Sequence, residues 1–282
     1  MKSGTDLERA VELLAATPAG EALGTNACEV VEALLVALER GEIRAAVRGD
    51  DNNWRAVPWV KRGILLGFRL GAVVEMPGFG ATKFFDKDTY PPRTLAMGDG
   101  IRVVPGGSSI RRGTFLAAGV VCMPPMYVNV GAYVGSGTMI DSHALVGSCA
   151  QIGERVHISA AAQVGGVLEP INASPVVVED DVIVGGNCGI YEGTVVRKGA
   201  VIGAGVVLTR GTPVYDLVHE RVYRGNADAA LEIPADAVVV PGARQVNAGW
   251  GAEQRLSLQT PVIVKYRDDK TDSATALEGW LR

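Results

Sequence analysis

The sequence has no excess of basic residues. Its 282 residues include 27 lysines and arginines against 31 aspartates and glutamates, a formal net charge of -4. Proteins that bind nucleic acid or anionic membranes usually carry clustered positive charge, so we expect neither as a partner. Any anion that the protein binds must meet a local site.

Cysteine is also scarce, and the four cysteines lie far apart with no C-x-x-C pair. This pattern is typical of free thiols in a reducing compartment, not of a secreted disulfide framework. The first residues, MKSGTDLERAVELL, hold acidic side chains where a signal peptide needs an apolar core. No apolar run approaches the roughly 20 residues of a membrane span. We therefore expect a cytoplasmic protein that does not enter a membrane.

The first 100 residues are expected to form a mainly helical domain. In TDLERAVELLAA and in VVEALLVALE, apolar residues recur at helical spacing. Asn26 and Glu29 resemble a capping box at the start of the second of these helices. A third amphipathic stretch covers 59–70. Nothing in these helices resembles a catalytic motif.

Glycine is abundant, with 36 residues, and from Val104 onward it accompanies an aliphatic residue or cysteine at every sixth position. The steps of this ladder are Val104, Ile110, Leu116, Cys122, Val128, Val134, Ile140, Val146, Ile152, Ile158 and Val164, then, after a shift of two residues, Val178, Val184, Ile190, Val196, Ile202, Leu208 and Val214. Because glycine tolerates positive φ, it permits a bend every six residues.

A step of six residues holds one short strand and one turn, and three steps close a triangular coil that stacks on the next one as a parallel β-helix. A β-sandwich would not keep one phase over so many steps. The period does not set the hand of the helix. We predict a mainly β fold with three parts: a helical domain over 1–100, a β-helix over 101–240, and a short strand and helix segment over 241–282.

Several stretches resemble one family. GAYVGSGTMIDSHALVGSCAQIG, GGVLEP, YEGTVV and TPVIVKYRDDKT are together similar to the tetrahydrodipicolinate N-succinyltransferases of the bacterial lysine pathway, from about residue 54 to the C-terminus. This resemblance implies a left-handed β-helix and a homotrimer with active sites at subunit interfaces. It also implies succinyl transfer from succinyl-CoA to the amine of L-2-amino-6-oxopimelate, the ring-opened form of tetrahydrodipicolinate, with no metal.

Two carboxylates are the candidate catalytic residues. Asp141 follows a ladder residue where other steps have glycine, and from the residues alone a turn aspartate is a backbone cap. Glu192 alone would be a solvated glutamate. The resemblance makes Asp141 the residue that holds or deprotonates the acceptor amine, and makes Glu192 a second carboxylate that reaches the acceptor across a subunit boundary. Which of the two is the base stays open.

Further residues are candidates for binding, Arg102 by the resemblance and the others by their size, position or charge. Arg102, whose guanidinium suits a carboxylate, and Gly166 are expected to bind the acceptor along with Asp141. Ala204 and Gly205 are expected to let coenzyme A approach the backbone closely. A phosphate of the cofactor has three candidate partners, Lys198, Arg210 and Lys265, which are otherwise solvated charges.

The sequence departs from the family pattern at two places, and other functions stay open. His143 stands where the family usually has tryptophan, and Ala160 and Ala161 stand where it has two glycines. His143 could itself be the base, as histidine is in other hexapeptide acyltransferases. Alternatives are N-acetyl transfer to the same or a related amine, a non-catalytic trimeric scaffold, and a zinc hydratase, for which His143, His157 and His219 would have to converge.

Overall fold

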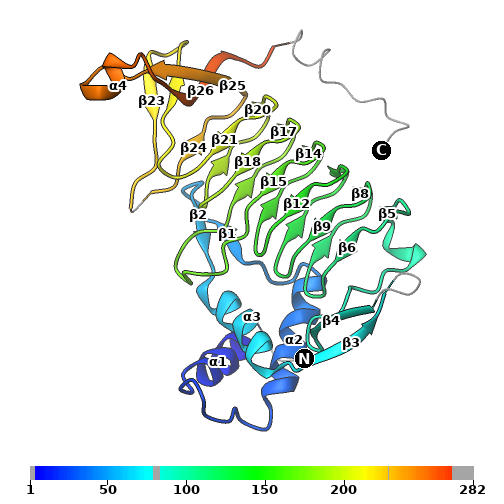
Figure 1. Ribbon diagram of the computed structural model, residues 1–282. Helices are drawn as coiled ribbons and strands as arrows, with labels where there is room; N and C mark the ends of the chain where they lie inside the picture. Colours follow the sequence, from blue (N-terminus) through cyan, green and yellow to red (C-terminus); the bar gives the residue numbers. More distant parts are fainter. Residues whose placement is uncertain (1–3, 79–82, 228, 269–282) are drawn as a thin grey trace.

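The computed structural model describes residues 4–78, 83–227 and 229–268 (Figure 1). Its first part is helical, with two short hairpins. The elements are α1 (Gly4–Ala15), α2 (Ala27–Glu39), β1 (Ala46–Arg48), β2 (Trp54–Ala56), α3 (Pro58–Leu70), β3 (Val73–Pro77), β4 (Lys83–Lys87) and the 3-10 helix η1 (Met97–Asp99). All three expected helices form. The capping box is wrong, because the Asn26 side chain makes no capping hydrogen bond.

The middle of the chain is a left-handed parallel β-helix of two-residue strands on three faces. Face I consists of β7 (Phe115–Leu116), β10 (Tyr133–Val134), β13 (Gln151–Ile152), β16 (Val177–Val178), β19 (Val195–Val196) and β24 (Glu232–Ile233). Face II begins with β5 (Arg102–Val103), β8 (Val121–Cys122), β11 (Met139–Ile140), β14 (His157–Ile158), β17 (Ile183–Val184) and β20 (Val201–Ile202). Face III consists of β6 (Ser109–Ile110), β9 (Tyr127–Val128), β12 (Leu145–Val146), β15 (Gln163–Val164), β18 (Gly189–Ile190) and β21 (Val207–Leu208).

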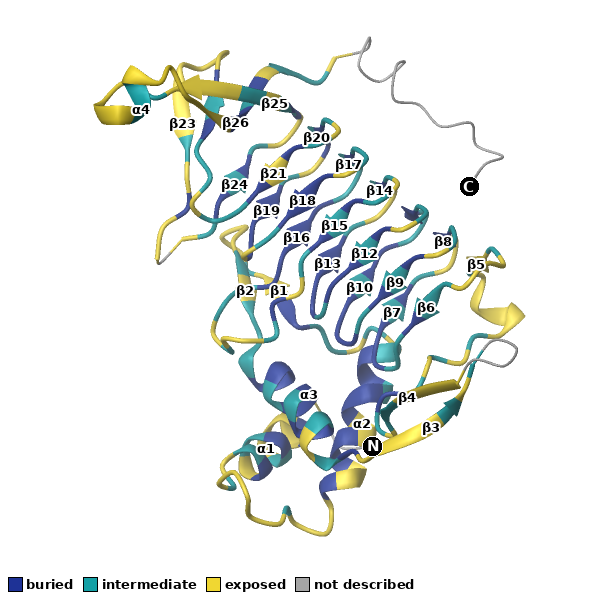
Figure 2. Cartoon of the chain, in the orientation of Figure 1, coloured by how far each residue is buried: buried dark blue, intermediate teal, exposed yellow. Residues whose placement is uncertain are grey.

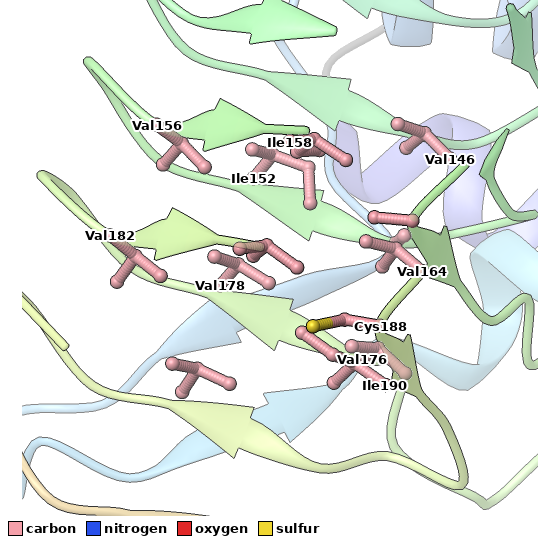
Figure 3. Close-up of a cluster of buried hydrophobic side chains, with 14 of the residues drawn as sticks. Val146, Ile152, Val156, Ile158, Val164, Val176, Val178, Val182, Cys188 and Ile190 are labelled. Atoms are coloured by element: carbon pink, nitrogen blue, oxygen red, sulfur yellow. The ribbon is translucent and has the colours of Figure 1, made fainter. Parts of the chain in front are cut away.

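The sixfold ladder is the core of this coil. Strands on one face pair in parallel with residues 18 apart, as Val128 does with Val146, so three steps of six make one turn and the β-sandwich alternative is wrong. Every ladder residue from Ile110 to Leu208 is buried, whereas Val104 at the open end is half-buried. Figure 3 shows part of the ladder, from Val146 to Ile190, pointing into the interior together with Val156, Val176, Val182 and Cys188, each of which stands two places before a ladder residue.

The shift of two residues in the ladder is in fact a long corner loop. Val146 pairs with Val164 one coil later, 18 residues away, but Val164 pairs with Ile190, so the intervening coil is longer by eight residues. The extra residues lie in the turn between β15 and β16, residues 165–176, which we call the corner loop. An insertion of eight and a slip of two give the same ladder phase, so the period alone could not separate them.

The end of the ladder also differs from the prediction. Val214 is buried, but it belongs to β22 (Val214–Asp216), which pairs with β23 (Arg221–Tyr223) and with β26. The coil resumes only at β24, where Ile233 pairs with Val196. Face II then continues through β25 (Ala237–Gln245), α4 (Gly249–Glu253) follows, and β26 (Ser257–Tyr266) pairs back antiparallel to β25. Residues 269–282 of the expected C-terminal segment lie outside the described residues.

Two clusters of buried side chains hold these parts together (Figure 2). One fills the coil, and the other packs α1, α2 and α3 with Val130 and Cys149 of the coil. The helices therefore share a core with the first coils, and the division at residues 100 and 240 stays a prediction. Within the described part of the chain, no helix is both long and apolar enough to cross a membrane.

Asp216 is the polar centre of the C-terminal strands. Its carboxylate is buried and accepts hydrogen bonds from Nδ1 of His219 at 2.9 Å, the hydroxyl of Tyr266 at 2.8 Å and the backbone N–H of Val218 at 2.9 Å. Burial alone would raise the pKa of Asp216, but hydrogen bonds from His219, Tyr266 and the backbone outweigh it and hold the pKa at about 2.

We expect the Asp216 carboxylate to make the free energy of unfolding depend on pH in the acidic range. Its folded pKa lies below the unfolded value near 3.9, so the stabilisation is complete above about pH 4 and is lost as the pH falls toward 2, by an amount on the order of 2 kcal/mol. Urea unfolding at pH 6 and pH 2 would measure it. Asp216→Asn should lose less stability over this interval than the wild type or Asp50→Asn, an exposed control, and parallel losses would contradict the prediction.

Candidate active site

Asp141 lies at the corner where the chain leaves β11 on face II and turns toward β12 on face III. Its Oδ1 accepts a hydrogen bond of 2.7 Å from the backbone N–H of Ser142. Its Oδ2 lies 3.7 Å from Nε2 of His157, and the side chain is 31% exposed. Asp141 is thus the turn cap that its position suggested, and it is also a carboxylate whose second oxygen the turn does not use.

Neighbouring backbone explains why other corners require glycine. A Cβ added at Gly147 would lie 2.1 Å from the backbone nitrogen of Gly166, and one added at Gly135 would lie 2.6 Å from the carbonyl carbon of Gly153. At both positions the next coil passes too close for any side chain. On the corner between faces II and III, position 141 has room for a side chain. Farther along the same corner, Gly185 does not, because a Cβ added there would lie 2.5 Å from the backbone nitrogen of Ala204.

His157 was considered in the sequence only as a metal ligand, and its place beside Asp141 was missed. It begins β14, where it pairs with Met139 of β11. The offset of 18 residues between successive coils could have revealed this neighbour. His143 is exposed on the corner with a left-handed backbone φ of 62°. Among the described residues, His157 and not His143 approaches the Asp141 carboxylate.

Glu192 lies at a different corner, between β18 on face III and β19 on face I. It is exposed, and its Oε2 accepts a hydrogen bond of 3.1 Å from the backbone N–H of Arg210. It lines a cavity of about 890 Å³, whose walls include Gly166, Glu169 and Asn172 of the corner loop. We call this space the Glu192 cavity.

Within one chain the structure does not bring the two carboxylates together. Asp141 and Glu192 border opposite edges of face III, and their coils are two apart, roughly 10 Å along the axis at about 4.8 Å per strand. Asp141 does not line the Glu192 cavity. A single subunit therefore offers two half-sites, one at each edge of face III.

The other candidates divide between these edges. Arg102 is exposed on β5, two strands from β11 on face II, and so lies on the Asp141 side. Gly166 lies with Glu192. Ala204 and Gly205 follow β20 at the Asp141 corner, three coils farther along, where a Cβ added at Gly205 would meet nothing within 4 Å. The structure thus leaves open space beside Gly205, one of the expected cofactor residues.

The structure separates the three candidate phosphate partners. Nζ of Lys198 lies 3.7 Å from Asp181, and Nζ of Lys265 donates to Asp268 at 3.0 Å. Arg210 lines the Glu192 cavity, and its buried Nε has no hydrogen-bond partner among the described residues. Of the three, Arg210 is therefore the cation best placed to meet an anionic ligand beside a candidate catalytic residue.

The three histidines lie on separate elements: the corner after β11, strand β14 and the turn after β22. Within the described ranges, no three histidine, cysteine, aspartate or glutamate side chains are grouped so that they could hold a metal ion. The convergence that the zinc hydratase alternative needs is not formed by these residues.

Comparison with known proteins identifies the family of the chain. Residues 7–70 match the N-terminal part of tetrahydrodipicolinate N-succinyltransferase, and residues 175–210 match the hexapeptide repeat of succinyl-transferases. The 2,3,4,5-tetrahydropyridine-2,6-dicarboxylate N-succinyltransferase of Bradyrhizobium diazoefficiens is 42% identical over 261 residues, which cover 90% of this chain and 89% of that protein. The chain belongs to the tetrahydrodipicolinate N-succinyltransferase family.

Other members of the family match over a similar length. The enzyme of that name from Polynucleobacter asymbioticus is 42% identical over 89% of this chain and 88% of its own. The match to the family begins at residue 7, so the helices belong to it as well, and the expected start near residue 54 is wrong. A hexapeptide-repeat acetyltransferase of Vibrio cholerae, complexed with acetyl coenzyme A, is 21% identical over 43% of this chain and 65% of its own, with a TM-score of 0.30, too low to argue from.

Proposed function

We propose that the protein transfers the succinyl group of succinyl-CoA to the amine of L-2-amino-6-oxopimelate in lysine and diaminopimelate biosynthesis, in the cytoplasm. The observation that carries the proposal is the 42% identity, over 90% of the chain, to a relative named for succinyl transfer to this dicarboxylate. The partly exposed carboxylate of Asp141 and the exposed carboxylate of Glu192 supply suitable chemistry for the acceptor.

The reaction needs positioning and one proton transfer. A thioester is already activated, so the amine attacks its carbonyl carbon, a C–N bond forms, the C–S bond breaks, and the thiolate of coenzyme A leaves. The attacking nitrogen must lose a proton, and a positioned carboxylate that accepts it contributes about 10²–10⁴-fold. In the proposal, Asp141 accepts this proton, Glu192 holds the amine, and Arg102 binds a carboxylate of the acceptor.

The two half-sites support a trimeric assembly. Because Asp141 and Glu192 lie at opposite edges of face III, one amine can meet both only if the Asp141 corner of one subunit faces the Glu192 corner of another. Cyclic symmetry would repeat this contact at each interface. We propose a homotrimer with one active site at each of these grooves.

Coenzyme A is proposed to lie along the Asp141 corner. Ala204 and Gly205 stand on this corner, and the pantetheine arm could hydrogen-bond to the backbone there, as an added strand does. Ala161 occupies the same corner with φ 57°, a conformation that costs a non-glycine residue roughly 1–2 kcal/mol. The alanine that replaces a family glycine therefore keeps the glycine backbone and adds a methyl group near the proposed cofactor path.

The proposal is tested by measuring thiol release from succinyl-CoA and from acetyl-CoA, each with and without the dicarboxylic acceptor. We expect release from succinyl-CoA only when the acceptor is present, and at least tenfold slower release from acetyl-CoA. Faster release with acetyl-CoA would favour the N-acetyltransferase alternative. No release with either donor would contradict the proposal.

A further inference from the structure

One lysine is buried at the junction between the helices and the coil. Lys61 on α3 is 0% exposed, and its Nζ donates a hydrogen bond to the carbonyl oxygen of Ala173 in the corner loop. Within the described residues, no carboxylate forms an ion pair with it. Burial lowers the pKa of Lys61, as expected for an ammonium without a negative partner.

The corner loop meets the helical part of the chain at two points. Leu168 packs against the buried cluster of α1, α2 and α3, and the Ala173 carbonyl meets Lys61. Figure 1 shows this loop, between β15 and β16, reaching from the coil toward α3. The exposed tip of the corner loop, residues 169–172, is therefore held on both sides, by Leu168 before it and by Ala173 after it.

The tip between these two points forms a wall of the Glu192 cavity. Glu169, Pro170 and Asn172 are exposed and line it, opposite Glu192. Near its far end, Ser174 packs against the turn that carries Glu192, because a Cβ added at Gly193 would lie 2.6 Å from the Ser174 carbonyl oxygen. A shift of the Ala173 carbonyl would therefore move groups on both sides of the cavity.

We propose that Lys61 is a positioning residue for the acceptor: by holding the Ala173 carbonyl, it fixes the corner loop as a wall of the Glu192 cavity and so sets the affinity for the dicarboxylic amine. This inference rests on the function proposed above. It gives the N-terminal helices a part in substrate recognition, although their sequence contains no catalytic motif.

Packing alone does not account for a lysine at this position. A methionine of similar length would fill the same space without the cost of burying an ammonium. What the ammonium adds is a directed, charge-assisted hydrogen bond to the Ala173 carbonyl.

The test is Lys61→Met, with Lys61→Arg as the conservative variant and Lys87→Met as the matched control. Lys87 also donates to a backbone carbonyl, that of Gly71 at 2.7 Å, but it does not line the cavity. For Lys61→Met we expect KM for the acceptor to rise about tenfold, KM for succinyl-CoA to change less than twofold, and the protein to stay folded. Lys61→Arg should recover part of the affinity, and Lys87→Met should change neither KM.

Hydrogen exchange separates this inference from the proposed function. We expect the amides of residues 165–176 to exchange faster in Lys61→Met than in the wild type, a result that needs no activity. Loss of folding in Lys61→Met would show a purely structural role and overturn the inference. An unchanged acceptor KM, or unchanged exchange in the loop, would also overturn it. If the wild type did not transfer succinyl groups, the proposed function would be contradicted. The exchange measurement would still show whether Lys61 holds the corner loop in place.

Discussion

Asp141→Asn is expected to lower kcat/KM for succinyl transfer by about 10³-fold, within the range that a positioned general base contributes. Asparagine keeps an oxygen that can accept the hydrogen bond of the Ser142 N–H, so the corner should fold as before. It cannot accept the proton of the attacking amine, and it has no charge to attract an ammonium. Thiol release at saturating succinyl-CoA measures the effect, with Asp50→Asn as an exposed control that should behave as the wild type.

Mixing subunits distinguishes loss of chemistry from loss of structure. Glu192→Gln should also lower kcat/KM, and neither variant should be active alone. In trimers formed at random from equal amounts of the two, about one quarter of the interfaces would pair an intact Asp141 with an intact Glu192, so about a quarter of the wild-type activity should return. No recovery in mixed trimers, or near-normal turnover in Asp141→Asn alone, would contradict the assigned roles.

Val146→Asp is expected to destabilise the coil by at least about 4 kcal/mol. Val146 is 0% exposed on β12 and lies between Val128 and Val164 of the neighbouring coils, so a carboxylate there would be buried with no partner. Circular dichroism during urea unfolding would show the loss.

Val207→Asp is the matched control, because Val207 lies on the outer side of β21 and is 41% exposed. We expect it to change stability by less than about 1 kcal/mol. Equal effects of the two variants would mean that the ladder is not the core.

Most of the coil could be predicted from the sequence because its rule is short. Away from the corner loop, a ladder residue is buried by the residues 18 before and after it, as Val146 is by Val128 and Val164. One repeating choice of side chain therefore defines both the strand and its neighbours. The rule fails where the chain leaves the stack. Val214 fits the spacing but lies on β22, and Ile233, which does continue the coil, follows a detour that breaks the period.

The individual residues of the site could be predicted from the sequence, but their relative positions in the coil could not. Motifs identified Asp141 and Glu192, yet the corner on which each stands depends on the number of residues between them. A slip of two and an insertion of eight give the same ladder phase but place Glu192 on different corners, and only the paired strands decide between them. The Asn26 capping box failed for a related reason: a motif names the residues without fixing their backbone angles.

The corner loop has a consequence for how such a protein can change. Val164 before the loop and Val178 after it are both 0% exposed, so eight residues enter the chain without disturbing the stacked interior. Groups that contact a ligand and groups that hold the scaffold are therefore encoded by different positions. Substitutions or insertions in a corner loop can therefore change which substrate the protein prefers without lowering the stability that the buried ladder provides.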